Sequence, residues 1–228
     1  MKVGVVVFPG SNCDRDAAHA VRLAGAEAEL LWHGTPELHG ADALILPGGF
    51  AHGDYLRAGA IARFSPIMGA VGEHVRRGGL VLGICNGFQV LTEAGLLPGV
   101  LRRNETLRFE HRWVTLEVER RDTPFTALVP EGQRLRMPIA HGEGSYWLPG
   151  AQLDELEAAG RVVFRYGTPE GNPNGSARDI AGVIDAAGRV CGLMPHPERA
   201  SEALLGSDDG LLLIRSLVES MARLGVAA

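Results

Sequence analysis

The sequence predicts an α/β fold: an open, mostly parallel sheet with helices on both faces and a few extra antiparallel strands, formed by a single domain over residues 1–228. Through the first half of the chain, short apolar runs alternate with longer segments of helical periodicity, which is the rhythm of βαβ units. The second half instead contains short strands in which apolar and polar residues alternate, a pattern typical of antiparallel strands with one solvated face.

In the first half, apolar or β-branched runs predict strands, and segments with 3.6-residue spacing predict helices. They follow one another as strand, helix, strand, strand, helix and strand at residues 3–8, 16–24, 28–32, 43–46, 66–76 and 80–84. The runs at 43–46 and 80–84 contain no alternating polar residues, so we expect them to be central strands covered on both faces.

In the second half, we predict strands at residues 113–119, 162–166 and 190–194, and a closing helix over residues 211–221. Glycine and proline are dense in residues 142–150 and 167–175, which we interpret as surface loops.

The basic and acidic residues argue against three classes of function. The 22 basic and 27 acidic residues give a net charge of −5, and no basic run is longer than a pair, so nucleic acid is not an expected partner. Lys2 is the only lysine. A P-loop needs a lysine after its second glycine, and an internal Schiff base needs a lysine amine, so both chemistries are excluded.

The expected location is the cytoplasm, with no membrane contact. The apolar run at residues 3–8 is too short for the core of a signal peptide, and no stretch approaches the 18 apolar residues of a membrane span. Cys13, Cys85 and Cys191 are odd in number and widely spaced, which favours free thiols over disulfides.

The most informative segment places Cys85 between an apolar strand and a helical pattern, with Gly83 and Gly87 two residues to either side. A Gly-x-nucleophile-x-Gly sequence at a strand-to-helix turn holds the reactive atom on a strained elbow, where glycines let neighbouring backbone approach. The helix N-terminus adds partial positive charge and free N–H groups that favour a thiolate. We therefore predict that Cys85 is a nucleophile, and that Cys13 and Cys191 are buried and inert.

A thiolate nucleophile needs a base and a group that orients the base, and the best candidates follow the strand at 190–194. In Pro-His-Pro-Glu-Arg, His196 and Glu198 are two residues apart and share one side of an extended chain. Open α/β folds carry their sites at this carboxyl edge of the sheet. His141 and Glu143 have the same spacing, so spacing alone does not separate the two pairs.

A second glycine-rich strand end, with Gly48 and Gly49, offers backbone N–H groups for a developing negative charge, together with the N–H of Asn86. Pro-Gly-Gly is also an ordinary turn, so both interpretations stay open. No metal is expected, because zinc deaminases combine His-x-Glu with Cys-x-x-Cys and this chain has no Cys-x-x-Cys.

Taken together, Cys85 in Gly-Ile-Cys-Asn-Gly-Phe-Gln, His196 and Glu198 in Pro-His-Pro-Glu-Arg, and Pro-Gly-Gly-Phe after a buried strand resemble class I, triad-type glutamine amidotransferases. Further motifs resemble, more narrowly, the glutaminase subunits of phosphoribosylformylglycinamidine synthase; they lie at residues 8–16, 53–62, 138–144, 172–176 and 194–199. The resemblance covers most of the chain. One departure is Ala51 and His52, where the family pattern has Ser-Tyr.

The resemblance implies a reaction. Cys85 would attack the side-chain amide of L-glutamine, His196 would take the thiol proton and pass it to the leaving ammonia, and Glu198 would orient the ring. Gln89, one turn along the helix, matches the substrate-side glutamine of the family.

The resemblance also implies partners. In the family, ammonia passes to a large synthetase subunit that uses ATP and Mg²⁺ to make phosphoribosylformylglycinamidine from formylglycinamide ribonucleotide, in de novo purine (IMP) biosynthesis, and a small third subunit is expected in the same complex. This chain has no recognisable ATP site, so we expect no cofactor of its own and place ATP and Mg²⁺ in the synthetase. The segment 141–146 is a candidate docking surface.

Other functions fit parts of the pattern. A cysteine elbow on a flavodoxin-like sheet also suits a cysteine peptidase or a redox-sensing protein, but these do not call for Pro-His-Pro-Glu-Arg and Gly-Phe-Gln together. A glutaminase that serves another acceptor is a further alternative. A non-catalytic interaction subunit would be marked by a replaced triad residue, and all three residues are present.

Overall fold

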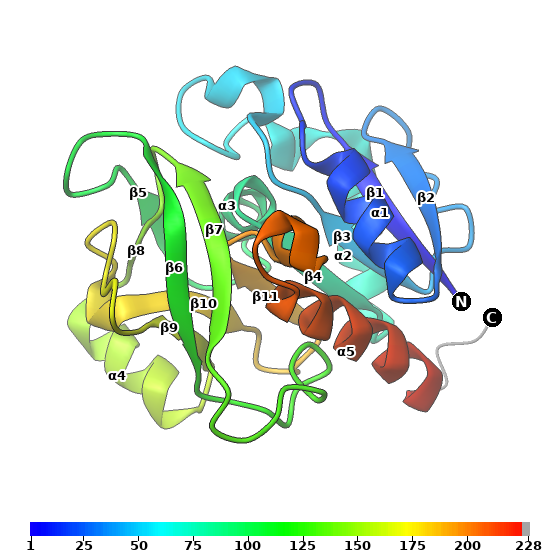
Figure 1. Ribbon diagram of the computed structural model, residues 1–228. Coiled ribbons are helices and arrows are strands. Elements are labelled where there is room, and N and C mark those ends of the chain that lie inside the picture. The colour runs from blue at the N-terminus through cyan, green and yellow to red at the C-terminus, as the bar shows by residue number, and fades with distance from the viewer. Residues whose placement is uncertain (225–228) are drawn as a thin grey trace.

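The computed structural model describes residues 1–224 and shows a nine-stranded mixed sheet flanked by helices (Figure 1). The strands lie in the order β2-β1-β3-β4-β11-β10-β9-β6-β7, and a second, two-stranded sheet pairs β5 with β8. In chain order the strands are β1 (Lys2–Val7), β2 (Glu27–Trp32), β3 (Ala43–Leu46), β4 (Leu80–Ile84), β5 (Val100–Arg102), β6 (Glu110–Val118), β7 (Leu135–His141), β8 (Ser145–Trp147), β9 (Val162–Tyr166), β10 (Ile180–Ile184) and β11 (Val190–Leu193).

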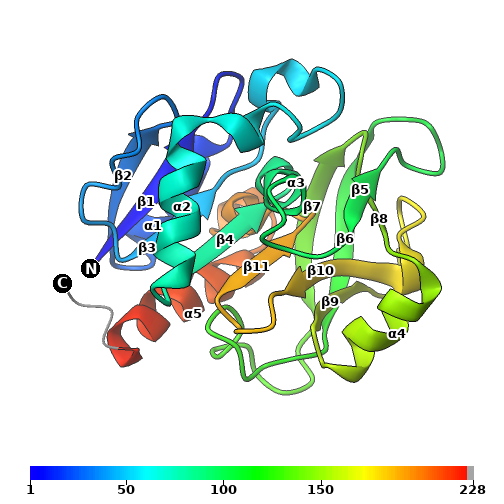
Figure 2. The ribbon, with the colours of Figure 1, turned by 180° about the vertical axis from the view of Figure 1, so that it is seen from behind.

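Helices cover both faces of the sheet, as Figures 1 and 2 show from opposite sides. The α-helices are α1 (Asp14–Leu23), α2 (Pro66–Arg76), α3 (Asn86–Glu93), α4 (Gly150–Ala158) and α5 (Asp209–Arg223). Five short 3₁₀ segments are η1 (Ala51–Asp54), η2 (Ala62–Phe64), η3 (Ala177–Asp179), η4 (Pro197–Ala200) and η5 (Ala203–Leu205). Helices α1 and α5 pack together on one face, and α2 and α3 lie on the other. The predicted fold class is confirmed.

The first half of the sheet is parallel. β2, β1, β3, β4 and β11 pair in parallel with their neighbours. Every residue of β3 and β4 is buried, because each strand has a neighbour on both sides and helices above and below. The prediction of two central strands at 43–46 and 80–84 is therefore confirmed.

The second half of the sheet is antiparallel and folds back over the first. Along the sheet, β10 pairs antiparallel with β11 and with β9, β9 pairs antiparallel with β6, and β6 pairs antiparallel with β7. The backbone N–H of His196, just after β11, donates to the carbonyl of Pro138 in β7 at 2.9 Å. This bond brings the last strand of the sheet back beside the carboxyl end of the parallel half.

Two strands of the main sheet were not predicted, and their sequences explain why. Pro138 interrupts β7, and a proline inside an apolar run argues against a strand unless the strand lies at an edge. β7 is such an edge, pairing with β6 alone. β10 contains Gly182, which lies where the pairing register with β9 shifts.

The prediction of a surface loop at residues 142–150 was wrong. Strand β8 lies inside it, and α4 begins at its end. Tyr146 is buried, stacks on Phe88 with ring centroids 6.0 Å apart, and donates its hydroxyl to the carbonyl of Pro98 at 3.0 Å. These contacts turn a glycine-rich segment inward. Elsewhere the boundaries moved slightly: the predicted helix at 16–24 is α1, and the predicted strand at 113–119 is β6.

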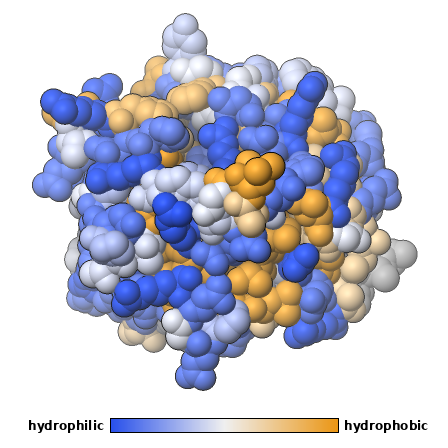
Figure 3. All heavy atoms as spheres, viewed as in Figure 1, coloured by the Kyte–Doolittle hydropathy of each residue, from blue (hydrophilic) through white to orange (hydrophobic). Residues whose placement is uncertain are grey.

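The surface over α1 and α5 is mostly hydrophilic, with apolar atoms gathered near its middle and lower part (Figure 3). No helix within residues 1–224 combines the length and the apolar character that crossing a bilayer requires. All three cysteines are buried and carry free thiols.

Candidate active site

Cys85 lies on a sharp turn between β4 and α3. Its backbone has φ 49° and ψ −105°, a conformation that is strained for a residue with a side chain. Gly87 makes the turn possible, because a Cβ atom there would come 1.9 Å from the carbonyl oxygen of Leu46. The predicted elbow is therefore present, and it points the thiol to the carboxyl edge of the sheet.

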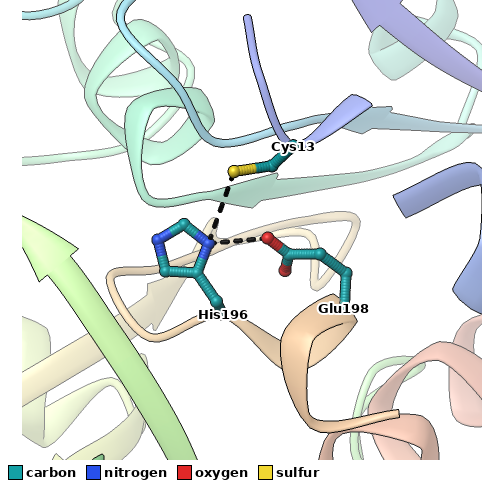
Figure 4. Close-up of side chains that lie close together, drawn as sticks. All are labelled: Cys13, His196 and Glu198. Carbon is teal, nitrogen blue, oxygen red and sulfur yellow. Dashed lines mark hydrogen bonds and ion pairs between the residues drawn. The ribbon is translucent and has the colours of Figure 1, made fainter. Parts of the chain in front are cut away.

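His196 and Glu198 form a buried pair beside this edge. His196 Nδ1 and Glu198 Oε1 are 2.6 Å apart, and both side chains are almost completely buried. Figure 4 shows Nε2 on the opposite side of the ring, and this atom has no hydrogen-bond partner among residues 1–224.

The environment of His196 favours its protonated form. Burial opposes a charge on the ring, but the electrostatic influence of Glu198 and then of Cys85, with a further contribution from the nearby sulfur of Cys13, more than offsets it. The pKa of His196 is therefore raised well above its ordinary value. An imidazole beside a thiol is the arrangement of a cysteine nucleophile with its base.

Cys13 also contacts the ring of His196, which the sequence did not reveal. Its Sγ lies 3.9 Å from Nδ1 and 3.3 Å from Oδ1 of Asn12 (Figure 4). Burial raises the pKa of the Cys13 thiol, so it stays protonated and weakly nucleophilic. Cys191, within β11, is fully buried, and burial raises its pKa further.

Cys13, His196 and Glu198 could also hold a metal ion. One ligand atom from each lies within 4.8 Å of the others. Glu198 already accepts the proton on His196 Nδ1, so a metal there would displace the hydrogen bond that orients the ring. The prediction that catalysis uses no metal stays a prediction.

Gly48 and Gly49, the predicted oxyanion residues after β3, lie close to His196 and to the cavity, respectively. A Cβ on Gly48 would come 2.6 Å from Cε1 of His196, so only glycine lets the ring lie this close. Gly49 lines the cavity beside Cys85. Asn86 is the first residue of α3, and its N–H has no partner within the helix. Its side-chain oxygen accepts the N–H of Ala51 at 3.0 Å and ties the elbow to the segment after β3.

A cavity of about 160 Å³ opens onto the thiol. It is smaller than the roughly 300–1,000 Å³ of typical ligand pockets, which favours a small substrate. Its walls come from both halves of the sheet: Gly49, Phe50, Asp54, Cys85, Gln89, Phe109, Ala140, His141, Gly142 and Glu143. The Cys85 Sγ lies 3.7 Å from the carbonyl oxygen of Ala140.

Gln89 lies in the wall of this cavity, where the resemblance expects a substrate-side residue. Its Oε1 accepts the side-chain amide of Asn86 at 2.9 Å, and its Nε2 donates to the carbonyl of Glu143. Gln89 therefore joins the elbow helix to the segment after β7.

Two carboxylates face each other across the cavity. Burial, and then the charge of Glu143, raises the pKa of Asp54 to about 6, while a hydrogen bond from Asn86 partly opposes this. Glu143 accepts the backbone N–H of Ala58 at 3.1 Å. Sequence reasoning selected neither residue as part of the site, although each lies within a motif that carries the resemblance.

The structure separates the two His-x-Glu pairs. His141 is bound at both ring nitrogens by asparagine amides: Nδ1 lies 3.1 Å from Oδ1 of Asn104, and Nε2 lies 3.4 Å from Nδ2 of Asn174. Burial lowers its pKa to about 3. A ring that stays neutral and has both nitrogens occupied is a poor base, whereas His196 has a free nitrogen and a carboxylate behind it.

The segment 141–146 is largely interior, which weakens it as a docking surface. His141, Gly144, Ser145 and Tyr146 are largely buried, and Gly142 and Glu143 are partly exposed. Exposed apolar side chains lie instead on the segments next to the cavity, where Phe50 and Phe109 stack with ring centroids 6.2 Å apart.

Comparison with known proteins agrees with this geometry. The family model of the CobB/CobQ-like glutamine amidotransferase domain matches residues 1–208. Phosphoribosylformylglycinamidine synthase subunit PurQ of Rubrobacter xylanophilus is 60% identical over 218 residues, covering 96% of this chain and 98% of the relative. The PurQ subunit of Moorella thermoacetica is 55% identical over 226 residues, covering 96% of each chain.

Solved structures give the same result. A chain in the structure of PurLQS from Thermotoga maritima superposes with a TM-score of 0.88 at 44% identity, covering 96% of this chain and 98% of that one. A glutamine amidotransferase of the same organism shares the fold, with a TM-score of 0.58 at 20% identity over 100% of this chain and 99% of that one.

Proposed function

Because this chain belongs to the glutamine amidotransferases and, within them, to the PurQ family of phosphoribosylformylglycinamidine synthase subunits, we propose that Cys85, His196 and Glu198 are the triad that hydrolyses L-glutamine. The observation that carries the assignment is the buried pair of His196 and Glu198, which leaves Nε2 free at the elbow that holds Cys85.

The proposed reaction starts from a Cys85 thiolate and a protonated His196. The Cys85 thiolate attacks the side-chain amide carbon, and the charged His196 passes its proton to the amide nitrogen, which leaves as ammonia. A water then gives a proton to His196 and attacks the thioester. Glutamate leaves, and the thiolate and the imidazolium are restored. Glu198 keeps Nδ1 protonated and stabilises the charge that returns to the ring.

The cavity walls supply binding. In this proposal, Gly48, Gly49 and the N–H of Asn86 form the side of the site that stabilises the oxyanion of the tetrahedral intermediates. Gln89 lies one helical turn from the thiol and holds the amino acid end of the substrate. No metal and no cofactor takes part in this half of the reaction.

A labelling experiment tests the assignment. The full chain, alone and assembled with the synthetase subunit, is treated with a glutamine-like electrophile and analysed by intact-mass spectrometry and peptide mapping. We expect one adduct, on Cys85, absent from Cys85→Ala, together with glutamine-dependent release of ammonia by the complex. Labelling of Cys13 or Cys191 in place of Cys85, or a complex that labels nowhere, would contradict the assignment.

The second half of the reaction belongs to partners. We propose that the ammonia passes to a synthetase subunit that uses ATP and Mg²⁺ to make phosphoribosylformylglycinamidine during IMP biosynthesis in the cytoplasm. PurLQS of Thermotoga maritima, in which the 44% identical chain is found, supports a complex with a synthetase and a small third subunit. The chain's single lysine, Lys2, supports the placement of ATP in the partner, because a P-loop cannot be formed.

The face that surrounds the cavity is the proposed docking surface for the synthetase. Large apolar side chains stand exposed there: Tyr55 at 73%, Leu56 at 90% and Leu107 at 79%. Arg57, Arg102, Arg103 and Arg108 lie among them, beside Glu143. Apolar anchors mixed with arginine are typical of the centre of a protein interface.

Charge substitutions test this surface. Leu107→Asp and Leu56→Asp should each weaken assembly with the synthetase by about tenfold or more, measured by analytical ultracentrifugation or titration calorimetry. Leu30→Asp, on the solvent side of edge strand β2, is the matched control and should leave assembly unchanged. Equal weakening by all three variants would remove the proposed surface.

A further inference from the structure

The outer wall of the cavity lies within residues 142–144, which follow strand β7 and are not part of the sheet. β7 pairs with β6 up to His141, and Gly142 and Glu143 then line the cavity. The carbonyl of Glu143 accepts Nε2 of Gln89. The position of residues 142–144 therefore determines both the width of the cavity and the orientation of Gln89.

Asn104, a buried residue between β5 and β6, fixes this segment from one side. Its Nδ2 donates to the carbonyls of His141 at 2.8 Å and Arg108 at 2.9 Å, and its Oδ1 accepts the N–H of Gly144 at 3.0 Å. Its own backbone N–H donates to the carbonyl of Gly142 at 3.0 Å. With the contact from His141, the amide uses its whole capacity of two donors and two acceptor positions. A flipped amide would face two carbonyls with oxygen, so the backbone groups determine the orientation.

Asn174 fixes the segment from the other side. Its Nδ2 donates to the carbonyl of Gly144 at 3.0 Å and to the hydroxyl of Tyr166 at 3.1 Å, and its Oδ1 accepts the hydroxyl of Ser176 at 2.8 Å. Asn104 and Asn174 come from different loops, and both hold residues 141–144; the loops also meet directly, where the N–H of Glu105 donates to the carbonyl of Asn174 at 3.0 Å.

The ring of His141 fills the space between the two amides. Because Oδ1 of Asn104 can only accept, Nδ1 of His141 carries the proton, and Nε2 lies 3.4 Å from Nδ2 of Asn174, whose two N–H groups donate to Gly144 and Tyr166. The ring packs on the next turn of chain, since a Cβ on Gly144 would come 2.3 Å from Cε1. Its two nitrogens thus lie against the side-chain amides of Asn104 and Asn174.

We propose that Asn104 and His141 are positioning residues of the glutamine site: through residues 142–144 they set the binding of glutamine and leave the reactivity of the Cys85 thiol unchanged. The inference rests on the proposed function, and it assigns the antiparallel half of the protein a role in substrate affinity. Asn104 also lies at the base of the exposed segment that carries Leu107, so the cavity wall and the proposed docking surface share one anchor.

The first test replaces Asn104 by Asp, which keeps the shape and removes both donors. In the assembled complex, we expect Asn104→Asp to raise the KM for glutamine about tenfold or more, with kcat within about threefold. Alkylation of Cys85 by iodoacetamide, a small electrophile that does not need the glutamine site, should stay within about twofold of the unsubstituted protein. An unchanged KM, or alkylation that slows in parallel, would overturn the proposal.

The second test separates positioning from proton transfer at His141. An amide can donate at one end and accept at the other, so His141→Gln should retain glutamine hydrolysis within about fivefold, whereas His141→Phe should raise KM about tenfold or more. A His141→Gln variant as inactive as Cys85→Ala would show that His141 acts chemically and would overturn the proposal.

Thr126→Val is the matched control for lost buried hydrogen bonding. Thr126 is fully buried, bonds Thr123 at 2.6 Å and lies away from the cavity. It should lower the melting temperature and leave KM unchanged. If the unsubstituted complex neither hydrolyses glutamine nor takes the glutamine-like label, the proposed function fails, and this inference fails with it. If the unsubstituted complex is active, the KM values of the Asn104 and His141 variants decide the inference alone.

Discussion

In the parallel half of the sheet, Cys85 and His196 follow neighbouring strands, and the backbone N–H of Cys85 donates to the carbonyl of Leu193 in β11 at 2.8 Å. In the antiparallel half, the cavity wall follows the end of strand β7 at His141, and the side-chain amides of Asn104 and Asn174 hold it in place. The proposed reacting groups thus follow two neighbouring parallel strands, whereas the proposed substrate wall is held by side chains. Chemistry and affinity should therefore respond to different substitutions.

The largest expected effect belongs to the parallel half. Glu198→Gln keeps the shape of the side chain but removes the charge that orients and stabilises the imidazolium, so kcat should fall about 10³-fold or more, with KM within about threefold. Glu202→Gln is the control, because Glu202 also pairs with a histidine, His19, but on the exposed surface, and its activity should be unchanged. Steady-state kinetics in the complex measures both. A change confined to KM would contradict the assignment of chemistry to the parallel half and of affinity to the antiparallel half.

The next effect concerns the elbow itself. Gly87→Ala would place a Cβ 1.9 Å from the carbonyl oxygen of Leu46, so we expect a loss of about 3 kcal/mol or more in the free energy of unfolding. Gly69 is exposed within α2, and a Cβ added there would have no heavy atom within 4 Å, so Gly69→Ala should stabilise the protein by about 0.5–1 kcal/mol. Urea unfolding gives both values. Equal effects would mean that the elbow does not depend on close approach.

A smaller effect, on stability, is expected at Asp54, which lines the cavity between the two halves of the sheet. The pKa of Asp54 is about 6, above its ordinary value of 3.8, so the folded state keeps this proton longer than the unfolded chain does. Stability is therefore lost as pH rises from about 4 to about 6, and Asp54→Asn escapes this loss. Discounted for partial exposure, the gain of the variant should reach about 1 kcal/mol, or a few degrees in Tm, by pH 7. A difference in Tm that does not grow between pH 4 and pH 7 would argue against the raised pKa that burial and the charge of Glu143 give Asp54.

The smallest effect is expected at Cys13. Its thiol lies 3.9 Å from Nδ1 of His196, on the side that Glu198 already occupies, and burial keeps the thiol protonated. Cys13→Ala should therefore keep kcat/KM within about threefold. A much larger loss would place Cys13 in the machinery of the parallel half.

The parallel half was accessible to sequence reasoning because its signals are local. The runs at 43–46 and 80–84 are continuous and apolar, the glycines around Cys85 define an elbow, and Pro-His-Pro-Glu-Arg keeps its histidine and glutamate two residues apart. Each of these patterns depends on a few neighbouring residues and on the rule that parallel strands end at one edge.

The antiparallel half was accessible only in part: strands β6 and β9 were predicted, but the contacts that build the cavity wall join distant segments. Asn104 and Asn174 are 70 positions apart in the chain and meet through His141, and nothing in the neighbourhood of either predicts the other. Pro138 in β7 and Gly182 in β10 are residues that argue against a strand, so neither strand was predicted. The glycines around Tyr146 suggest an exposed loop, although Tyr146 is buried. Cys13 reaches His196 from 183 positions away. Such contacts follow from tertiary packing, which a periodicity does not encode.

The bond between His196 and Pro138 has a consequence beyond catalysis. Strand β7 ends the nine-stranded sheet, and an unpaired strand edge is a template on which another chain can add. The segment with His196 and η4, together with α5, packs against β7 and covers this edge. The loop that carries His196, the proposed base, therefore also protects this edge from pairing with another chain, and substitutions that loosen the loop should promote aggregation as well as slow the proposed reaction.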